Sequence, residues 1–188
     1  DVAAAMAAAS KVVAGAYYYP FLNHATLEPQ TATAKWTADS CEAWVPTQDG
    51  EASLAAVIAA SGLTADKCDV IKVNLGGGFG RRLNGDYGVP ALLAAKALGK
   101  PVKVVFSRED DSRFDSPRSA SVQQVSMAFD ESEKIVGMQH HASAGWPTSA
   151  MVPGFLGTGT NGEKFDPFSI NGAQHWYDVG AHRVRAIK

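Results

Sequence analysis

A run of glycines followed by two arginines carries the clearest chemical signal in the sequence. It reads Gly76-Gly77-Gly78-Phe79-Gly80-Arg81-Arg82 and lies between a predicted strand and a predicted helix. Consecutive glycines let the backbone approach a ligand closely and reach positive φ, so that several N–H groups can face one anion. Guanidinium groups bind phosphate oxygens through paired hydrogen bonds. The run predicts a ligand-binding loop; the alternative is a glycine-rich turn that only joins the two elements.

Two common nucleotide-binding patterns do not fit this loop. A dinucleotide fingerprint, G-x-G-x-x-G, would need glycine at position 81, which is Arg81. A phosphate-binding P-loop would need Gly-Lys-Ser/Thr, and Gly80 is followed by Arg81 instead. The loop therefore predicts a different kind of ligand. Arg81 and Arg82 have two open interpretations, contact with that ligand or exposure to solvent.

The other residues able to bind metals or protons give weaker signals. His24 and Glu28 are four residues apart, but Pro29 favours an extended backbone before it, so a structural hydrogen-bonding role is favoured over metal binding. His140 and His141 are neighbours in a predicted strand and therefore face opposite sides. His175 and His182 are expected at the surface, with a place beside a substrate path as the alternative.

The cysteine count excludes an iron–sulfur cluster on this chain. Cys41 and Cys68 are far apart and neither belongs to a CxxC pair. We expect buried thiols, and a disulfide between them is the alternative. No metal site and no catalytic residue is predicted within residues 1–188.

Composition places the chain among ordinary globular proteins. Of the 188 residues, 46% are hydrophobic and 19% charged, and the net charge is -2. This balance gives no basic footprint for nucleic acid, and no apolar stretch reaches the roughly 18 residues of a membrane span. The first residue is Asp1 and no signal segment follows, so we expect a processed chain or part of a longer protein.

The elements that would position these residues can be read from periodicity. Alternation and β-branched residues predict strands at 14–19, 31–36, 41–45, 69–75, 102–106, 120–129 and 134–143. The strands at 31–36 and 41–45 are predicted to form a hairpin, as are those at 120–129 and 134–143, and the short strand at 102–106 is predicted to be buried. Helical spacing and caps predict helices at 2–13, 51–61 and 86–98, with Asp86 as an N-cap and a further helix start at Ser107. Gly62 and Gly99 are the predicted C-cap glycines of the second and third helices. Residues 145–176 form a long irregular loop. We predict an α+β fold, a mixed sheet with helices packed on one face, and no strong domain linker.

Several motifs, taken together, resemble one enzyme family. They are His24-Ala25-Thr26-Leu27-Glu28-Pro29, Cys41-Glu42-Ala43-Trp44-Val45-Pro46-Thr47-Gln48, the glycine run with Asp86-Tyr87, and Ser107-Arg108-Glu109-Asp110-Asp111. In order and spacing they are similar to the molybdopterin-binding subunit of molybdenum hydroxylases, the xanthine dehydrogenase and aldehyde oxidase family. The branch most resembled holds isoquinoline 1-oxidoreductase β-subunits and bacterial aldehyde dehydrogenases.

The resemblance implies a set of cofactor-binding residues. It places the Gln48 amide near the molybdenum's apical oxygen, and it places backbone N–H groups of Phe79 and Gly80 against the cofactor. Gly77, Gly78 and Arg81 complete the expected site. Arg183 matches, more loosely, a family arginine near the substrate pocket. Where purine-oxidising relatives carry a substrate-binding glutamate this chain has about Leu83, which favours an aldehyde or a neutral N-heterocycle over a purine.

The resemblance also implies that residues 1–188 are the first portion of a larger cofactor-binding region in a bacterial subunit, cytoplasmic or periplasmic. The expected cofactor is molybdopterin, as its cytosine dinucleotide. Partners would be the rest of the molybdenum subunit, a chain carrying iron–sulfur clusters, and a small-molecule substrate. The family's catalytic glutamate and a second cofactor loop would lie beyond Lys188, so no hydroxylase activity is expected of this chain alone. A non-catalytic small-molecule or phosphate-binding domain is the alternative function.

Overall fold

The computed structural model describes residues 1–188 and divides the chain into two compact units. Unit 1 consists of Asp1–Leu22 together with Arg118–Lys188, and unit 2 of Asn23–Pro117. The chain thus leaves unit 1, completes unit 2 and then returns. The sequence shows no strong linker at either crossing, and the division follows from which segments pack together. The α+β class is confirmed, and a mixed sheet occurs once in each unit.

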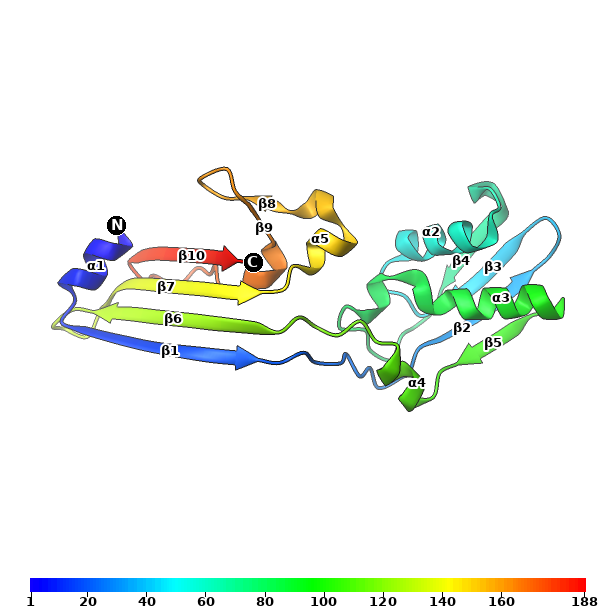
Figure 1. Ribbon diagram of the computed structural model, residues 1–188, viewed down its shortest axis with the longest axis horizontal. Helices are drawn as coiled ribbons and strands as arrows, with labels where there is room; N and C mark the ends of the chain where they lie inside the picture. Colours follow the sequence, from blue (N-terminus) through cyan, green and yellow to red (C-terminus); the bar gives the residue numbers. More distant parts are fainter. The chain divides into compact units, whose positions relative to one another are not determined.

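Unit 1 is built on a sheet with the strand order β1-β6-β7-β10 (Figure 1). Its elements are the helix α1, Val2–Ala8, and the strands β1, Lys11–Tyr19, β6, Ser121–Phe129, β7, Ile135–Ala144, and β10, Ala181–Ile187. The predicted hairpin of β6 and β7 is confirmed, with β1 antiparallel to β6 and β10 parallel to β7. The first helix is shorter than predicted, because the chain becomes extended at Ala9. Strand β10 was not predicted.

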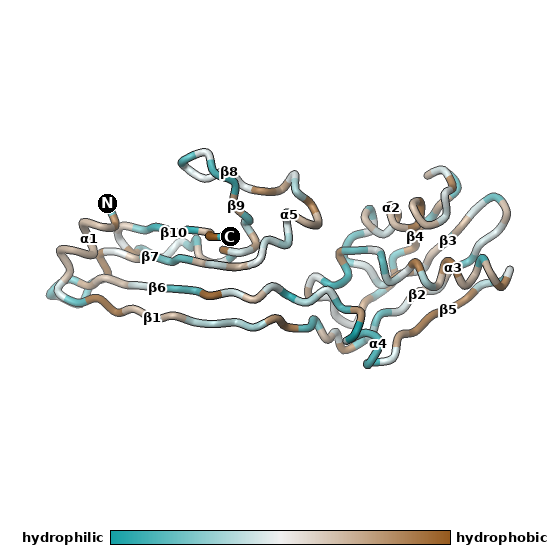
Figure 2. Tube along the Cα trace, in the orientation of Figure 1, coloured by the Kyte–Doolittle hydropathy of each residue, from teal (hydrophilic) through white to brown (hydrophobic).

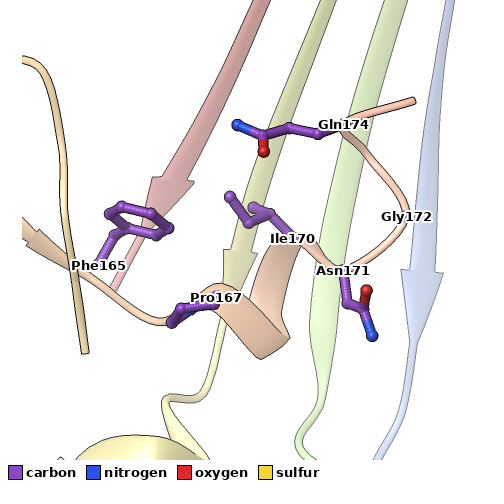
Figure 3. A pocket seen from close by; sticks show the side chains of 6 residues that line it. All are labelled: Phe165, Pro167, Ile170, Asn171, Gly172 and Gln174. Carbon is purple, nitrogen blue, oxygen red and sulfur yellow. The ribbon is translucent and has the colours of Figure 1, made fainter. Parts of the chain in front are cut away.

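Residues between β7 and β10 fold into short elements joined by irregular chain. These are α5, Pro147–Met151, η4, Pro153–Phe155, β8, Gly157–Thr158, β9, Lys164–Phe165, and η5, Pro167–Ile170. The fully buried Asp166 carboxylate accepts hydrogen bonds from the backbone N–H and the hydroxyl of Thr148. A pocket of about 270 Å³ is lined here by Phe165, Pro167, Ile170, Asn171, Gly172 and Gln174 (Figure 3). Asp166 therefore holds together a segment with little regular structure.

Four histidines lie close to one another in unit 1, namely His140 and His141 on β7, His182 on β10, and His175 before β10. The amide oxygen of Gln123 accepts a hydrogen bond from Nε2 of His140 at 2.7 Å, and the His182 ring stacks on His175 with centroids 5.0 Å apart. Burial lowers the pKa of His140 and of His182, and neighbouring imidazoles lower both further. Burial also lowers the pKa of His141, aided by the positive charges of Arg185 and Arg183. The fold therefore favours the neutral form of His140, His141 and His182.

We expect unit 1 to lose stability as the pH falls below about 6.5. In the unfolded chain these imidazoles titrate near 6.5, and in the folded chain their pKa is lower. The unfolded state therefore takes up more protons, so the stabilising contribution is complete above that pH and is lost as the pH falls through the folded pKa. Thermal unfolding between about pH 7.5 and 5.5 tests this, with His140→Gln/His182→Gln as comparison. Equal slopes for both proteins would contradict it.

Unit 2 contains a second sheet with the strand order β4-β3-β2-β5. Its strands are β2, Thr31–Trp36, β3, Cys41–Val45, β4, Cys68–Lys72, and β5, Val102–Val105. The predicted β2–β3 hairpin is confirmed, and β4 lies parallel to β3. Alternate side chains of these strands, among them the fully buried Ala34 and Ala43, form one core with Val57 and Leu92. Figure 2 shows hydrophobic colours along β5, which supplies Val102 and Val104 to this core.

Two helices supply the other half of that core. They are α2, Gly50–Ser61, and α3, Val89–Leu98, and both lie on one face of the sheet (Figure 1). The predicted glycine caps are confirmed, since Gly62 and Gly99 adopt the left-handed conformation at the two helix ends. The short helix α4, Arg108–Arg113, begins after Ser107, whose hydroxyl accepts from the Asp110 N–H as predicted. The arrangement leaves the ends of β3 and β4 together beside the glycine run.

Three predictions in unit 2 are corrected. Helix α3 begins at Val89, and Asp86 is not its N-cap, because the 3-10 helix η3, Gly85–Gly88, precedes it and the Asp86 carboxylate pairs with Arg81. Strand β4 ends at Lys72 instead of residue 75. Strand β5 was predicted to be buried but lies at the sheet edge, with Val105 61% exposed. The remaining elements are the 3-10 helices η1, Ala65–Lys67, and η2, Arg81–Leu83.

None of the helices has the length and apolar character that crossing a membrane requires.

Candidate functional site

The glycine run forms a loop between β4 and the helices that follow it. Its backbone enters the positive-φ region at Gly77, Phe79 and Gly80, with φ of 104°, 54° and 106°. Glycine reaches this region at no steric cost, whereas an aromatic residue there is strained. The Phe79 side chain is 63% exposed, so core packing does not explain its conformation. The loop therefore has an unusual backbone conformation, and the Phe79 side chain is exposed to solvent.

Gln48 lies directly on this loop. Its side-chain Oε1 accepts hydrogen bonds from the backbone N–H of Gly80 at 2.9 Å and of Arg82 at 3.3 Å. These two contacts fix the orientation of the amide, because only the oxygen can accept. The Nε2 amino group is therefore the other end of the amide, away from these two contacts, and the Gln48 side chain is exposed. The parallel pairing of β3 with β4 brings Gln48 and the loop together.

Gly78 fits closely against the same side chain. A Cβ atom at Gly78 would lie 2.3 Å from Oε1 of Gln48, well inside van der Waals contact. Any larger residue at position 78 would therefore displace the Gln48 amide. The backbone N–H of Gly80, predicted to face a cofactor, instead donates to Gln48 in this structure.

The two arginines of the loop are buried, so their exposure to solvent is excluded. The Arg81 guanidinium forms paired hydrogen bonds with the Asp86 carboxylate at 2.8 and 3.1 Å, and its Nε lies 3.3 Å from Asp115. The fully buried Arg82 guanidinium donates to the carboxylate of Glu28 and to three backbone carbonyls. Each buried positive charge is therefore paired with carboxylates of the same unit.

Glu28 ties the start of the loop to its end. Its Oε2 accepts from the Gly76 N–H at 3.0 Å and from Nη2 of Arg82 at 3.0 Å. The backbone N–H of Glu28 also donates to the Gly76 carbonyl. The structural hydrogen-bonding role predicted for Glu28 agrees with these contacts.

His24 faces the other end of the loop. Its Nδ1 lies 2.9 Å from the Asp115 carboxylate, so in the neutral ring Nδ1 carries the proton and Nε2 is the acceptor. A Cβ atom at Gly80 would lie 3.4 Å from that Nε2. Asp115, which also pairs with Arg81, was missed by the sequence analysis. It stands 91 residues from His24, and no local pattern marks the pairing.

The site has the chemistry of a neutral hydrogen-bonding surface. Gln48 offers amide donors, His24 offers an imidazole nitrogen, and the glycines allow close approach to the backbone. Because Asp86, Asp115 and Glu28 neutralise the two arginines, the loop lacks the free guanidinium groups that a phosphate site uses. This arrangement fits a polar heterocycle such as a pterin, which is recognised by neutral donors and acceptors.

Arg183 and Leu83, also named in the sequence predictions, belong to different units. Arg183 is an exposed residue of β10 in unit 1, where its charge acts on His141. Leu83 ends η2 directly after the loop and is 37% exposed. The role of Arg183 in a substrate pocket remains a prediction.

Comparison with known proteins identifies the family. The model of the family described as molybdopterin cofactor-binding domain matches residues 1–157, a range that includes Gln48 and the whole glycine loop. The chain belongs to this family. The predicted resemblance to molybdenum hydroxylase subunits is therefore confirmed, and molybdopterin binding is the property that defines the matching domain.

Curated relatives of this molybdopterin cofactor-binding domain are bacterial oxidoreductases. Over 115 residues the chain is 59% identical to the membrane-bound aldehyde dehydrogenase [pyrroloquinoline-quinone] of Gluconacetobacter polyoxogenes, covering 61% of the chain and 15% of that protein. It is 33% identical over 165 residues to isoquinoline 1-oxidoreductase subunit beta of Brevundimonas diminuta, covering 87% and 21%. The chain thus spans about a fifth or less of these two relatives.

Solved structures show the same fold. The aldehyde oxidoreductase from Desulfovibrio gigas matches with a TM-score of 0.64 at 22% identity, over 77% of this chain and 16% of that chain. At this identity the similarity shows the fold alone.

Proposed function

We propose that this chain is part of the subunit of a molybdopterin-dependent oxidoreductase that oxidises an aldehyde or an N-heteroaromatic compound. The observation that carries the proposal is the Gln48 amide, fixed by two loop N–H groups so that its donors are available to a ligand. The family match and the relatives named for aldehyde and isoquinoline oxidation support it. Residues 1–188 supply one portion of the cofactor-binding region, with the rest of the subunit as their partner.

The residues of the loop have separate roles in this proposal. Gln48 donates a hydrogen bond to the cofactor through Nε2, and Gly77 and Gly78 let the backbone come close to it. Phe79 and Gly80 complete the surface. When bound, molybdopterin with its metal supplies the two-electron oxidation, while the protein supplies shape and hydrogen bonds.

Arg81 and His24 support this surface from behind. Because Asp86 and Asp115 engage its side chain, Arg81 contributes by holding the loop in place. His24 places Nε2 beside Gly80, and in the neutral ring with the proton on Nδ1 this nitrogen can accept a hydrogen bond from a ring N–H of the pterin.

The finer features follow from the family. The cofactor would be the cytosine dinucleotide form of molybdopterin. Electrons would leave through iron–sulfur clusters of a partner chain. The two cysteines of this chain, Cys41 and Cys68, lie on adjacent strands of one sheet and are too few to bind such a cluster. Arg183 would contact the substrate.

A single added methyl group tests the proposal. In the complete subunit, purified with its partner chains, we expect Gly78→Ala to lower molybdenum and pterin content, because its Cβ would overlap the Gln48 amide. Displacing the amide removes its hydrogen bond to the cofactor, a loss of about 1–3 kcal/mol, equivalent to roughly fivefold to 150-fold weaker binding. Metal analysis and pterin fluorescence after release measure the change.

Gly50→Ala is the matched control, because a Cβ there meets no atom within 4 Å. We expect it to retain full cofactor content. Equal molybdenum in both variants would contradict the role of the loop. Wild-type protein that contains pyrroloquinoline quinone but no molybdenum would contradict the proposed cofactor, and phosphate binding without either cofactor would favour the non-catalytic alternative.

A further inference from the structure

The two cysteines of the chain face each other across neighbouring strands. Cys41 begins β3, Cys68 begins β4, and the parallel register pairs them directly. Their sulfur atoms lie 3.4 Å apart and both are free thiols. Adjacent strands are about 4.8 Å apart, within the range of Cα separations found in disulfides. A disulfide therefore needs only a small rotation of the side chains to bring the sulfurs to about 2.05 Å.

The two thiols differ in accessibility. Cys41 is 1% exposed, and burial together with the neighbouring Cys68 raises its pKa to about 11. Cys68 is half-buried and lies 3.5 Å from the Ser61 hydroxyl. Nothing in the cofactor loop uses either sulfur. The pair thus has one sulfur that reagents can reach and one that is protected.

We propose that Cys41 and Cys68 are a disulfide-forming pair that fastens β3 to β4 under oxidising conditions. This inference does not rest on the proposed function, because it needs only the register of the two strands. The oxidant is a small-molecule or protein disulfide.

The oxidation proceeds as thiol–disulfide exchange. The Cys68 thiolate attacks one sulfur of the oxidant, forming a mixed disulfide and releasing the other sulfur as a thiolate. Cys41 then gives its proton to water, attacks the Cys68 sulfur, and releases the second thiolate. Two cysteine thiols are oxidised and one oxidant disulfide is reduced to two thiols. Attack by Cys68 comes first because it is the more exposed sulfur.

The bridge would act on the strands that lead to the cofactor loop. Gln48 follows the end of β3 and Gly76 follows the end of β4, so the two cysteines stand at the opposite ends of these strands. Fastening them fixes the register on which the contact between Gln48 and Gly80 depends. We expect the oxidised protein to unfold at a temperature higher by a few degrees, about 2–10 °C.

Peptide mapping of the complete subunit tests the pairing. The subunit is equilibrated with oxidised and reduced glutathione in varied ratio, quenched with an alkylating reagent and digested with trypsin. Cleavage after Lys35, Lys67 and Lys72 places Cys41 in one peptide and Cys68 in the next. We expect these two peptides to remain linked, lighter by two hydrogen atoms than their sum, and to separate after reduction.

Folding should favour the bridge strongly. Because the sheet presets the contact, we expect half-oxidation at an oxidising ratio at least about tenfold lower than in concentrated urea. Cys41→Ser should leave Cys68 as a glutathione adduct, which confirms that Cys68 is reachable. The proposal would be overturned if the wild-type protein gave only alkylated cysteines or glutathione adducts. It would also be overturned if half-oxidation needed the same glutathione ratio in urea as in the folded protein.

Discussion

Gln48→Ala in the complete subunit is expected to lower turnover by up to about a thousandfold. The variant removes the Nε2 donor that we assign to the cofactor, and a donor that acts mainly in the transition state has effects of this size. It also frees the N–H groups of Gly80 and Arg82, but Gln48 is exposed, so water can replace its oxygen. The free energy of unfolding should therefore change by about 1 kcal/mol at most. Steady-state kinetics and denaturant unfolding measure both effects.

A second substitution distinguishes the role of the accepting amide oxygen from that of the donating nitrogen. Gln48→Glu keeps an oxygen that can accept from Gly80 and Arg82 but replaces the donating NH₂ with an acceptor. We expect the loop to remain ordered while turnover falls nearly as far as in Gln48→Ala. Gln174→Ala, at an exposed glutamine of unit 1, is the control and should leave turnover unchanged. A Gln48→Glu enzyme with full molybdenum content and undiminished turnover would remove Gln48 from the site.

The parts of the fold that were predictable from the sequence are those with local signals. The turn at residues 37–40 is closed by the Thr37 hydroxyl, which accepts from the Ser40 N–H, and this fixes the hairpin of β2 and β3. Gly62 and Gly99 mark helix ends because they can adopt positive φ. Alternating residues on both sides of 130–133 predict the hairpin of β6 and β7. In each case the determining residues lie within a few positions of each other.

Pairings between distant segments were not predictable in this way. Strand β1 pairs with β6 in a register that joins Lys11 to Phe129, and nothing in either strand specifies its partner. A division into two units depends on such pairings, so one mixed sheet was predicted where each unit has its own. Strand β10 follows an irregular segment and alternates polar with apolar residues over only Ala181–Ile187. This alternation is too short to have predicted a strand.

The residues that support the candidate site were not predictable from the sequence. The glycine loop was inferred from its residue types and Gln48 from a resemblance to a family, and the structure places the two in contact. The supports are charge pairs across long separations, such as Arg82 with Glu28, 54 residues apart. An arginine next to a glycine loop indicates a ligand contact by its type alone. Only the fold shows that its donors are already used.

Arg82→Met is expected to destabilise unit 2 by about 3–5 kcal/mol. The Arg82 guanidinium is fully buried and donates to the carbonyls of Pro46, Glu28 and Pro29 as well as to the Glu28 carboxylate. Methionine fills similar space but donates nothing, so these acceptors lose their partner inside the fold. Pro46 keeps one hydrogen bond, from the Tyr87 hydroxyl at 3.0 Å, which limits the loss.

Lysine at this position should not restore the stability. Its ammonium is a single centre and cannot reach acceptors on both sides of the chain as the planar guanidinium does, so we expect Arg82→Lys to lose most of the same free energy. Arg113→Met, at an exposed arginine of the same unit, is the control and should change stability by less than about 0.5 kcal/mol. Amide hydrogen exchange of β2, β3 and α3 in the complete subunit localises the effect to unit 2. An Arg82→Met protein with wild-type protection in these elements would show that Arg82 only fills space, and that Glu28 alone holds the loop through Gly76.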